Sequence, residues 1–386
     1  MRRRELLGVL VGAGGLALPG RLDRLGHEAT WRELVVNRPD VVYLPAKYDG
    51  MLTYAVGETD EYLLSLSATV PHPFFTVTGT EANQANVYTS DSVHLMVDVR
   101  DRETGRVIPS NVSLALSREG ETVEERVLWP MLSQRMGFHY GDTFSLPEDG
   151  SYSARIGVDP VAASRVGTFA GRFADRQTLD VGIEFSEGEI DDLECVLIDV
   201  DRRGRPGALP PMEHDDHGHG DGVEGTEADG EHDHRDDHDE GGHGDRGDGT
   251  EHEPSPERLA SPSSLPGEVL GVAESGDARV AATVIGGSST DGPGSYLAVS
   301  PRTPHNAYPL PTLALSARVR DGDDVRFDGP LPEAVGPELG VHYGAEMPGV
   351  GRGNEVRIAV DAPPQLARHE GYETAFLDMD PVRFDH

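Results

Sequence analysis

The sequence is almost without cysteine and lysine. Cys195 is the only cysteine among 386 residues, so an intramolecular disulfide and a metal site built from paired thiols are both excluded. It stands in an apolar stretch, 195–198, where we expect a buried structural thiol. Lys47 is the only lysine, and arginine supplies nearly all of the positive charge.

Positive charge as a whole is scarce. The chain has 33 Lys and Arg against 68 Asp and Glu, which gives a net charge of -35. A chain without a basic patch is a poor partner for nucleic acid or for an anionic membrane surface. This acidic, lysine-poor balance is typical of a halophilic protein, because concentrated salt screens the self-repulsion. We interpret the charge as an adaptation to habitat and not as a sign of function.

Long apolar runs are also missing. The apolar stretch 8–19 is too short and too rich in glycine for a membrane span, which needs about 20 residues. Arg3 and Arg4 precede it by a few residues, and this pattern resembles a twin-arginine export signal, which we assign to residues 1–26. No cysteine follows, so a lipobox is lacking. The sequence therefore predicts an exported protein, secreted or at the cell surface.

The pattern of the remaining chain is that of an all-β protein. Abundant glycine and proline favour turns, and short stretches of alternating polarity lie between the turn signals. Strands are predicted at 62–70, 93–99, 112–116, 122–128, 152–158, 179–185, 278–284, 295–299, 312–319, 324–327 and 356–360. Their spacing predicts two tandem immunoglobulin-like β-sandwich domains, at 40–200 and 267–386.

Residues 202–266 interrupt this pattern, because Pro, Gly, Asp, Glu and His replace almost all apolar side chains. Such a segment buries too little surface to offset its ordering entropy, so we predict a disordered linker. Half of the 16 histidines of the chain stand here: His214, His217, His219, His232, His234, His238, His243 and His252. Imidazoles and carboxylates on a flexible chain can capture copper, iron or zinc loosely. The alternative is an acidic spacer with incidental histidines.

The two blocks repeat each other in sequence. Leu-Ala-Leu-Ser occurs at 114–117 and at 313–316, and Gly-x-His-Tyr-Gly occurs at 137–141 and at 340–344. A third pair, at 155–159 and 357–361, follows in the same order and at nearly the same spacing. These matches predict a diverged tandem duplication of one sandwich.

The repeated histidines are candidates for metal binding. His139 and His342 each stand in a Gly-x-His-Tyr-Gly segment, which we expect to form a turn between strands. In the first block, His94 and Met96 share one face of an alternating strand, and Met131 opens the loop that ends at His139. Two imidazoles with one or two thioethers suit copper, especially Cu(I). Core packing is the alternative for the methionines, above all for Met96.

These residues resemble a known family, the periplasmic iron-uptake proteins that have an immunoglobulin-like sandwich and a copper site. The similarity rests on the His-Leu-Met strand at 94–96 and on the Trp-Pro-Met run at 129–131 that leads to Gly-Phe-His-Tyr-Gly. The resemblance implies an exported, homodimeric protein that binds copper and iron and works beside an iron permease. His94, Met131 and His139 match the family's ligands. Met96 stands where the family has a glutamate associated with iron, and Phe173 where it has its last histidine.

The second block lacks different members of this ligand set than the first block does. It keeps His342 and has His369 at the place of the missing histidine, but Tyr296 replaces the strand histidine. Because the resemblance implies paired copies, the duplication could fold as an intramolecular pseudo-dimer in which His369 approaches the first-block site. Independent decay of the second site is the alternative. The candidate metal ligands are thus His94, Met96, Met131, His139, His342 and His369.

We therefore expect an exported metal-binding protein that serves copper-assisted iron acquisition. The chain has no nucleophile elbow, P-loop or dinucleotide fingerprint, so we do not expect an enzyme. The alternative, from another class, is a surface structural or adhesion protein whose sandwiches recognise partners without metal. His72 and His305 lie beside prolines and belong to no comparable motif.

Overall fold

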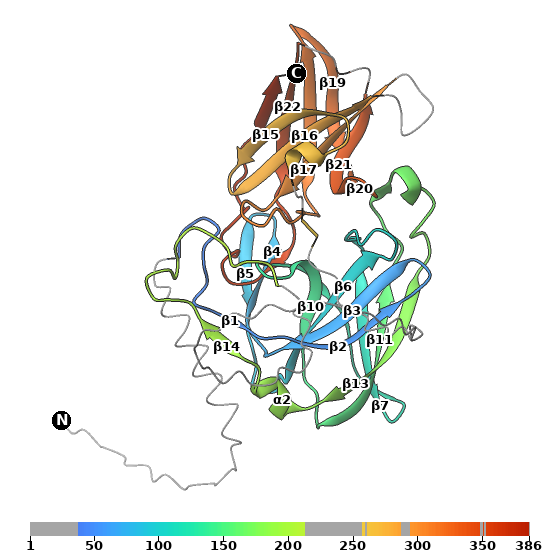
Figure 1. Cartoon of the computed structure of the whole chain (residues 1–386), viewed down its shortest axis with the longest axis vertical. Helices are drawn as coiled ribbons and strands as arrows, with labels where there is room; N and C mark the ends of the chain where they lie inside the picture. The colour runs from blue at the N-terminus through green and yellow to red at the C-terminus, as the bar shows by residue number, and fades with distance from the viewer. Residues whose placement is uncertain are drawn as a thin grey trace, which may run out of the picture.

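The computed structural model describes residues 38–212, 257–258, 261–286, 294–347, 350 and 353–385. The predicted export signal, the eight linker histidines and most of the predicted linker lie outside these residues. The described part is all-β, as the sequence predicts, and forms two sandwiches that stack end to end (Figure 1). No helix in this part is long and apolar enough to cross a membrane.

The first sandwich packs an eight-stranded sheet against a four-stranded sheet. The larger sheet has the order β2 (Leu52–Glu58), β3 (Tyr62–Thr69), β6 (Val93–Asp101), β10 (Gly137–Phe144), β9 (Trp129–Ser133), β23 (Ala367–Arg368), β4 (Phe74–Thr78), β5 (Glu81–Ala85). The smaller sheet has the order β13 (Gln177–Phe185), β11 (Gly150–Val158), β7 (Val112–Arg118), β8 (Glu121–Val127). A small ribbon of β1 (Lys47–Asp49) and β14 (Cys195–Leu197) lies beside them, and helix α2 (Glu187–Asp191) precedes β14.

The second sandwich repeats this strand order. Its larger sheet has the order β15 (Glu268–Ser275), β16 (Ala278–Gly286), β17 (Ser295–Arg302), β21 (Gly340–Met347), β20 (Glu333–Gly336), β12 (Ser164–Arg165). Its smaller sheet has the order β24 (Val382–Asp385), β22 (Asn354–Ala362), β18 (Ala314–Asp321), β19 (Asp324–Leu331). Strand for strand, β6, β9 and β10 thus correspond to β17, β20 and β21.

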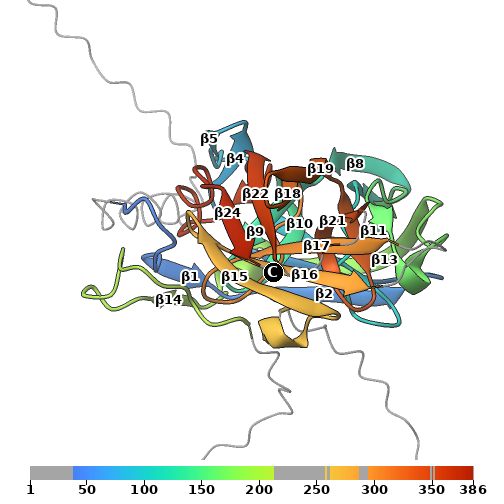
Figure 2. The ribbon, with the colours of Figure 1, turned by 90° about the horizontal axis from the view of Figure 1, so that it is seen from above.

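The two sandwiches exchange a strand. β23 comes from the second block but lies in the large sheet of the first sandwich, parallel to β9 and antiparallel to β4. In return, β12 from the first block lies parallel to β20 in the second sandwich. The same exchange, made twice, gives the two halves an approximate two-fold relation. Figure 2 shows the molecule from above, where the strands of the second sandwich lie in front of those of the first.

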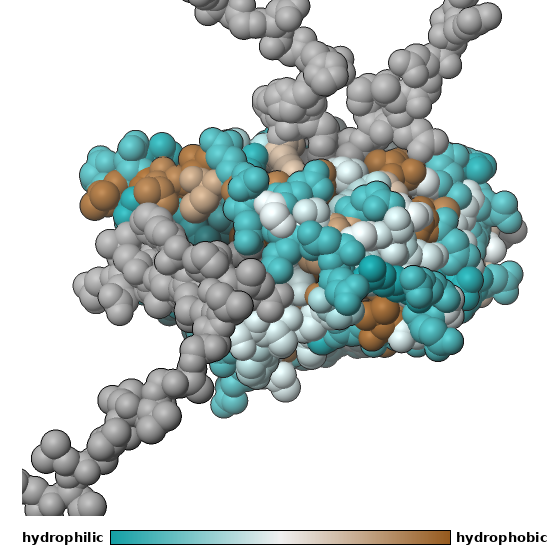
Figure 3. All heavy atoms as spheres, turned by 90° about the horizontal axis from the view of Figure 1, so that it is seen from below, coloured by the Kyte–Doolittle hydropathy of each residue, from teal (hydrophilic) through white to brown (hydrophobic). Residues whose placement is uncertain are grey.

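Burial follows the alternation of the strands. On β11, every second side chain from Tyr152 to Val158 is buried, and the side chains between them face solvent until the strand nears its end. Most buried apolar residues of both sandwiches and of their junction belong to one continuous hydrophobic cluster. On the face drawn in Figure 3, hydrophilic residues predominate and hydrophobic residues form separate patches. This surface agrees with the strongly acidic composition.

Two local predictions are wrong. The Gly-x-His-Tyr-Gly segments are not turns, because β10 and β21 run through them and His139 and His342 stand within strands. The glycines that resemble turn signals are needed instead at the strand start, where Gly137 has φ 73, and at a close approach described below. Cys195 is exposed and not buried, since β14 pairs only with the short β1 and packs into neither sandwich core.

The ends of the predicted linker pack on the sandwiches. Leu209 is buried with Leu44 and Ile198, and its backbone N–H donates to the Gln134 side chain at 2.8 Å. At the other end, a 3-10 turn (Pro262–Ser264) leads into the buried Leu265.

Candidate metal centre

The candidate ligands of the first sandwich lie on the outer face of its large sheet. His94 and Met96 alternate on β6 with leucine and valine side chains that fill the core. On the neighbouring strands, His139 of β10 is the direct cross-strand partner of Met131 of β9. Cross-strand partners point to the same face, so the sheet itself brings His139 and Met131 together.

Gly141 provides the space between these side chains. A Cβ atom at this position would lie 3.0 Å from His94 Nε2 and 3.1 Å from Met131 Sδ. Both distances are shorter than most side-chain carbons show, so a side chain here would push the neighbouring atoms aside, and the position favours glycine. An imidazole nitrogen and a thioether sulfur therefore converge on one gap above the sheet.

His369 reaches the same place from the second block. The exchanged strand β23 pairs Ala367 with Met131, and the backbone N–H of His369 donates to the Leu132 carbonyl at 3.1 Å. The ring of His369 lies 5.3 Å from that of His139 and 5.8 Å from that of His94, measured between centroids. The strand exchange is therefore what carries a second-block histidine to the first-block residues.

A fourth histidine, His72, completes the cluster from the connection between β3 and β4. Its ring centroid is 4.5 Å from that of His94 and 4.8 Å from that of His369. One ring nitrogen from each of these three residues lies within 4.8 Å of the others. His72 Nδ1 is 2.9 Å from the Val70 carbonyl, and its Nε2 is 2.8 Å from His369 Nδ1.

The hydrogen bonds assign the tautomers. A carbonyl only accepts, so neutral His72 donates from Nδ1 to Val70 and its Nε2 accepts from the Nδ1–H of His369. His139 likewise donates from Nδ1 to the Gly137 carbonyl at 3.1 Å. His369 and His139 are thus left with a lone pair on Nε2, as metal-binding histidines are when their other nitrogen is held in this way.

Three buried nitrogens in this cluster have no hydrogen-bond partner in the described part of the chain: the Nε2 atoms of His94, His139 and His369. The Nδ1 of His94 is 3.1 Å from Thr143 Oγ1. Leaving a buried polar atom unpaired costs about 1–3 kcal/mol. Unpartnered imidazole nitrogens of this kind are suited to hold a metal ion, and that of His94 also lies at the Gly141 gap with the Met131 thioether.

Burial keeps these imidazoles neutral. Desolvation lowers the pKa of His139 to about 4, and it lowers the pKa of His94 and of His369 well below the usual range, with the neighbouring histidines adding to the effect. At neutral pH the three rings are uncharged, so the Nε2 lone pairs of His139 and His369 are available to a metal without displacing a proton.

The corresponding place in the second sandwich is closed. His342 donates from Nδ1 to the Gly340 carbonyl at 2.9 Å, as His139 does to Gly137, but its Nε2 lies 3.0 Å from the hydroxyl of Tyr296. Tyr296 has the β17 position that His94 has on β6, and its phenol fills the space above Gly344. Burial raises the pKa of Tyr296 to about 12, so the phenol stays protonated and donates.

The other donors are also replaced there. Ala334 is the cross-strand partner of His342 and so takes the place of Met131. Val166 takes the place of His369, since its N–H donates to Val335 at 2.9 Å just after the exchanged strand β12. The sequence assignment of Phe173 to this place is therefore wrong, because Phe173 packs in the hydrophobic core. The structure thus brings together five residues, His72, His94, Met131, His139 and His369, and leaves His342 in a separate, apolar position.

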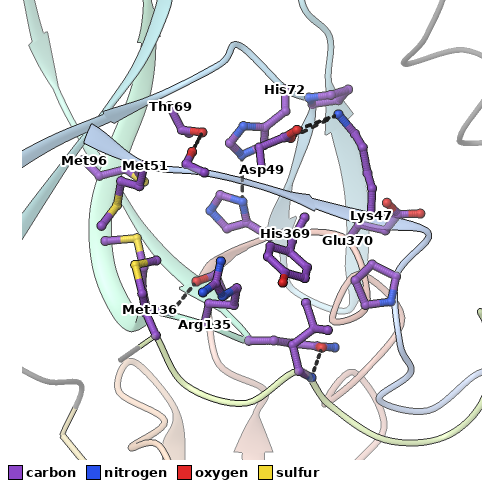
Figure 4. Close-up of a pocket in the computed structure, with 18 residues that line it drawn as sticks. Lys47, Asp49, Met51, Thr69, His72, Met96, Arg135, Met136, His369 and Glu370 are labelled. Atoms are coloured by element: carbon purple, nitrogen blue, oxygen red, sulfur yellow. Dashed lines mark hydrogen bonds and ion pairs between the residues drawn. The ribbon is translucent and has the colours of Figure 1, made fainter. Parts of the chain in front are cut away.

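A cavity connects this cluster to solvent. It encloses about 850 Å³, counting the part that is open, and His72 and His369 form part of its wall. Met96 also lines it, so this side chain faces the cavity (Figure 4). Lys47 and Asp49 form an ion pair of 3.0 Å in the same wall.

Sequence reasoning missed the role of His72. Its Pro-His-Pro surroundings match no ligand motif, and only the path of the chain between β3 and β4 brings it to His94. His305, the other histidine without a motif, is not in the cluster.

Comparison with known proteins gives two limited likenesses. A family model described as a domain of unknown function (DUF7350) matches residues 263–385, which include the second sandwich. No curated protein matches the chain.

Two solved structures of FetP from uropathogenic Escherichia coli strain F11 are similar in part, one as isolated after expression in the periplasm and one of a copper-bound variant. Each shares 20% identity and covers 36% of this chain and 95% of the FetP chain, with TM-scores of 0.29 and 0.26. At these scores the likeness supports no argument about the site, which rests on its own geometry.

Proposed function

We propose that this chain is a copper-binding protein and that it holds the metal as Cu(I) between the two blocks. The ligands are Nε2 of His94, His139 and His369 together with Sδ of Met131. The observation that carries the proposal is the set of three buried, unpartnered Nε2 atoms, of which that of His94 meets the Met131 sulfur at the Gly141 gap.

The donor set favours copper over harder metals. Imidazole and thioether are the ligands that Cu(I) prefers, whereas calcium, magnesium and manganese need oxygen donors. No carboxylate belongs to the four donors. Three neutral imidazoles and a thioether bring no negative charge, so a singly charged ion leaves less uncompensated charge in this buried site than a divalent ion would.

The surrounding residues hold these donors in place. The Gly137 carbonyl fixes the ring of His139, Thr143 contacts His94, and His72 accepts a hydrogen bond from His369. We assign His72 to positioning, because both of its ring nitrogens are engaged at 2.9 and 2.8 Å. Such outer partners typically contribute about 10 to 100-fold to metal affinity.

In this proposal, the protein serves iron acquisition outside the cytoplasm. Copper assists this process, and an iron permease is the partner in the membrane. The twin-arginine pattern and the family resemblance of the sequence support this part. The linker histidines would add loose capture of metal. The alternative, a surface structural or adhesion protein, predicts no bound metal, so the metal content of chain purified without an affinity tag separates the two functions.

One substitution tests the composite site. His369→Ala removes a ligand that only the second block supplies, so copper affinity should fall by about 10 to 100-fold, or about 1.4 to 2.8 kcal/mol. Competition with a Cu(I) chelator measures this in the presence of the weaker linker histidines. His342→Ala is the matched control and should leave the affinity unchanged. Equal affinities in parent and His369→Ala would show that His369 is not a ligand.

A further inference from the structure

Methionine is concentrated around the cavity that leads to the histidine cluster. The chain has 8 methionines. Met51, Met96, Met136 and Met212 line this cavity, and Met131 lies behind it at the Gly141 gap. The four cavity residues come from four separate segments: the start of β2, strand β6, the turn before β10 and the chain after β14.

These four side chains do not serve as core packing. The two methionines of the second sandwich that the structure describes, Met347 and Met379, belong to the main hydrophobic cluster. None of the four cavity methionines belongs to any hydrophobic cluster of the described residues, although Met96 is buried. Figure 4 shows the thioethers of Met51, Met96 and Met136 gathered at one side of the cavity, across from the imidazole of His369.

The charged residues of the cavity balance each other. Lys47 is paired with Asp49, and Arg135, whose guanidinium lies 4.3 Å from the ring centroid of Tyr48, stands in the same wall as Glu370. Two cationic and two anionic side chains leave the wall without net charge in a chain of net charge -35. This cavity therefore offers little electrostatic attraction to divalent cations, and its distinctive donors are sulfur atoms.

We propose that Met51, Met96, Met136 and Met212 form a second, thioether-only binding site for Cu(I) in the cavity beside the imidazole site. Thioethers are soft and neutral, so they bind Cu(I) or Ag(I) and discriminate against zinc and iron. The sulfurs lie across the cavity from His369, so an ion can bind to them without contacting the imidazoles. The site therefore selects the metal by softness, and it does not depend on the imidazoles to bind.

Methionine methyl resonances provide the test, because they report on thioethers and ignore the linker histidines. The full chain, labelled with ¹³C at the methionine methyl groups, is titrated with Ag(I) as a redox-inert stand-in for Cu(I). The resonances of the four cavity methionines should shift together, while those of Met347 and Met379 stay in place. Zinc should move none of the four.

A near-isosteric double variant checks that the shifts report a site. Met51→Leu with Met136→Leu keeps the volume and removes two sulfurs, so it should lose one tight Ag(I) equivalent. Met379→Leu is the control and should lose none. If the four resonances stay unmoved and the double variant keeps the parental stoichiometry, the methionines are packing residues and the proposal is overturned.

The same spectra separate this proposal from the imidazole site. Shifts of the four cavity methionines without a shift of Met131 would support the thioether site and count against the proposed copper site. A shift of Met131 alone would support the copper site and overturn the thioether site.

Discussion

The Gly-x-His-Tyr-Gly strands of the two sandwiches each hold one buried histidine, and the two histidines differ in the state of one ring nitrogen. His139 and His342 are both buried, both donate from Nδ1 to the carbonyl of the glycine two residues earlier, and both have a pKa lowered to about 4 by desolvation. They differ at Nε2, which is unpartnered in His139 and lies 3.0 Å from the Tyr296 hydroxyl in His342.

This difference shows which property identifies a ligand. Burial and a lowered pKa are shared, so they cannot separate a metal ligand from a structural histidine. The free lone pair and the space in front of it do separate them. In the second sandwich a single phenol removes both, because it donates to the histidine and fills the gap above Gly344.

The largest expected effect comes from giving the first site the residue of the second. In His94→Tyr, the phenol should fill the Gly141 gap and donate to His139 Nε2, so two ligands are lost at once. At about 10 to 100-fold for each ligand, copper affinity should fall by about 100 to 10,000-fold. Chelator competition measures the loss, and affinity within about tenfold of the parent would contradict the equivalence of the two positions.

The next expected effect is a loss of folding stability in acid, to which the buried histidines of both halves contribute. His342 has a folded pKa of about 4 against 6.5 in the unfolded chain, so between these values only the unfolded chain binds the proton. The free energy of unfolding should therefore fall as pH drops from about 6.5 to 4, by about 3 kcal/mol for this residue. Urea unfolding of copper-free protein across this range measures it.

Two variants sharpen this result. His342→Gln and His139→Gln should each reduce the dependence on pH by a similar amount, because the two histidines have the same lowered pKa. A dependence that neither variant reduces would show that other groups cause the acid sensitivity.

A smaller loss of stability should follow when the second site loses its hydroxyl. Tyr296→Phe leaves His342 Nε2 buried without a partner, which costs about 1–3 kcal/mol. Denaturant unfolding measures the change, and copper binding should not move. Tyr88→Phe is the control, since that ring is 68% exposed. Full stability in Tyr296→Phe would mean that the phenol does not satisfy His342.

The smallest effect tests the gap itself. A methyl group in Gly141→Ala would stand 3.0 Å from His94 Nε2, so the ring must shift and copper affinity should fall by about tenfold, or about 1.4 kcal/mol. Gly182→Ala is the control, because Gly182 also lies in a strand but a Cβ there would have open space around it. This variant should leave copper affinity unchanged. Unchanged affinity in Gly141→Ala would place the metal away from this gap.

The strands with alternating polarity could be predicted from the sequence. Each predicted segment from 62–70 to 356–360 overlaps an observed strand, because alternation directly reflects one buried and one exposed face. β9, β10, β20 and β21 could not be found in this way. Their segments contain glycine or proline, and these residues imitate turn signals although the strands run through them.

Much of the candidate site could also be predicted from the sequence, including the approach of His369 to the first-block histidines. The repeated motif identifies His139 and His342 equally, and the sequence separates them only by the replacement of the strand histidine by Tyr296. That the Tyr296 hydroxyl occupies Nε2 of His342 is seen only in the structure. His72 has no signal in the sequence, because its position depends on the path of the chain beyond β3. The four cavity methionines are separated from one another by 45, 40 and 76 residues along the sequence, so no local spacing reveals them.

The exchange of β12 and β23 has a consequence for how such a molecule could diverge. In an assembly of two identical chains, every substitution appears in both sites, so a change that closes one pocket closes the other. Here each half inherits its own residues, and the strand that completes a pocket comes from the opposite half. Covalent fusion therefore let the symmetry break: His369 and Val166, at matching positions, now complete a polar cluster in one half and an apolar one in the other.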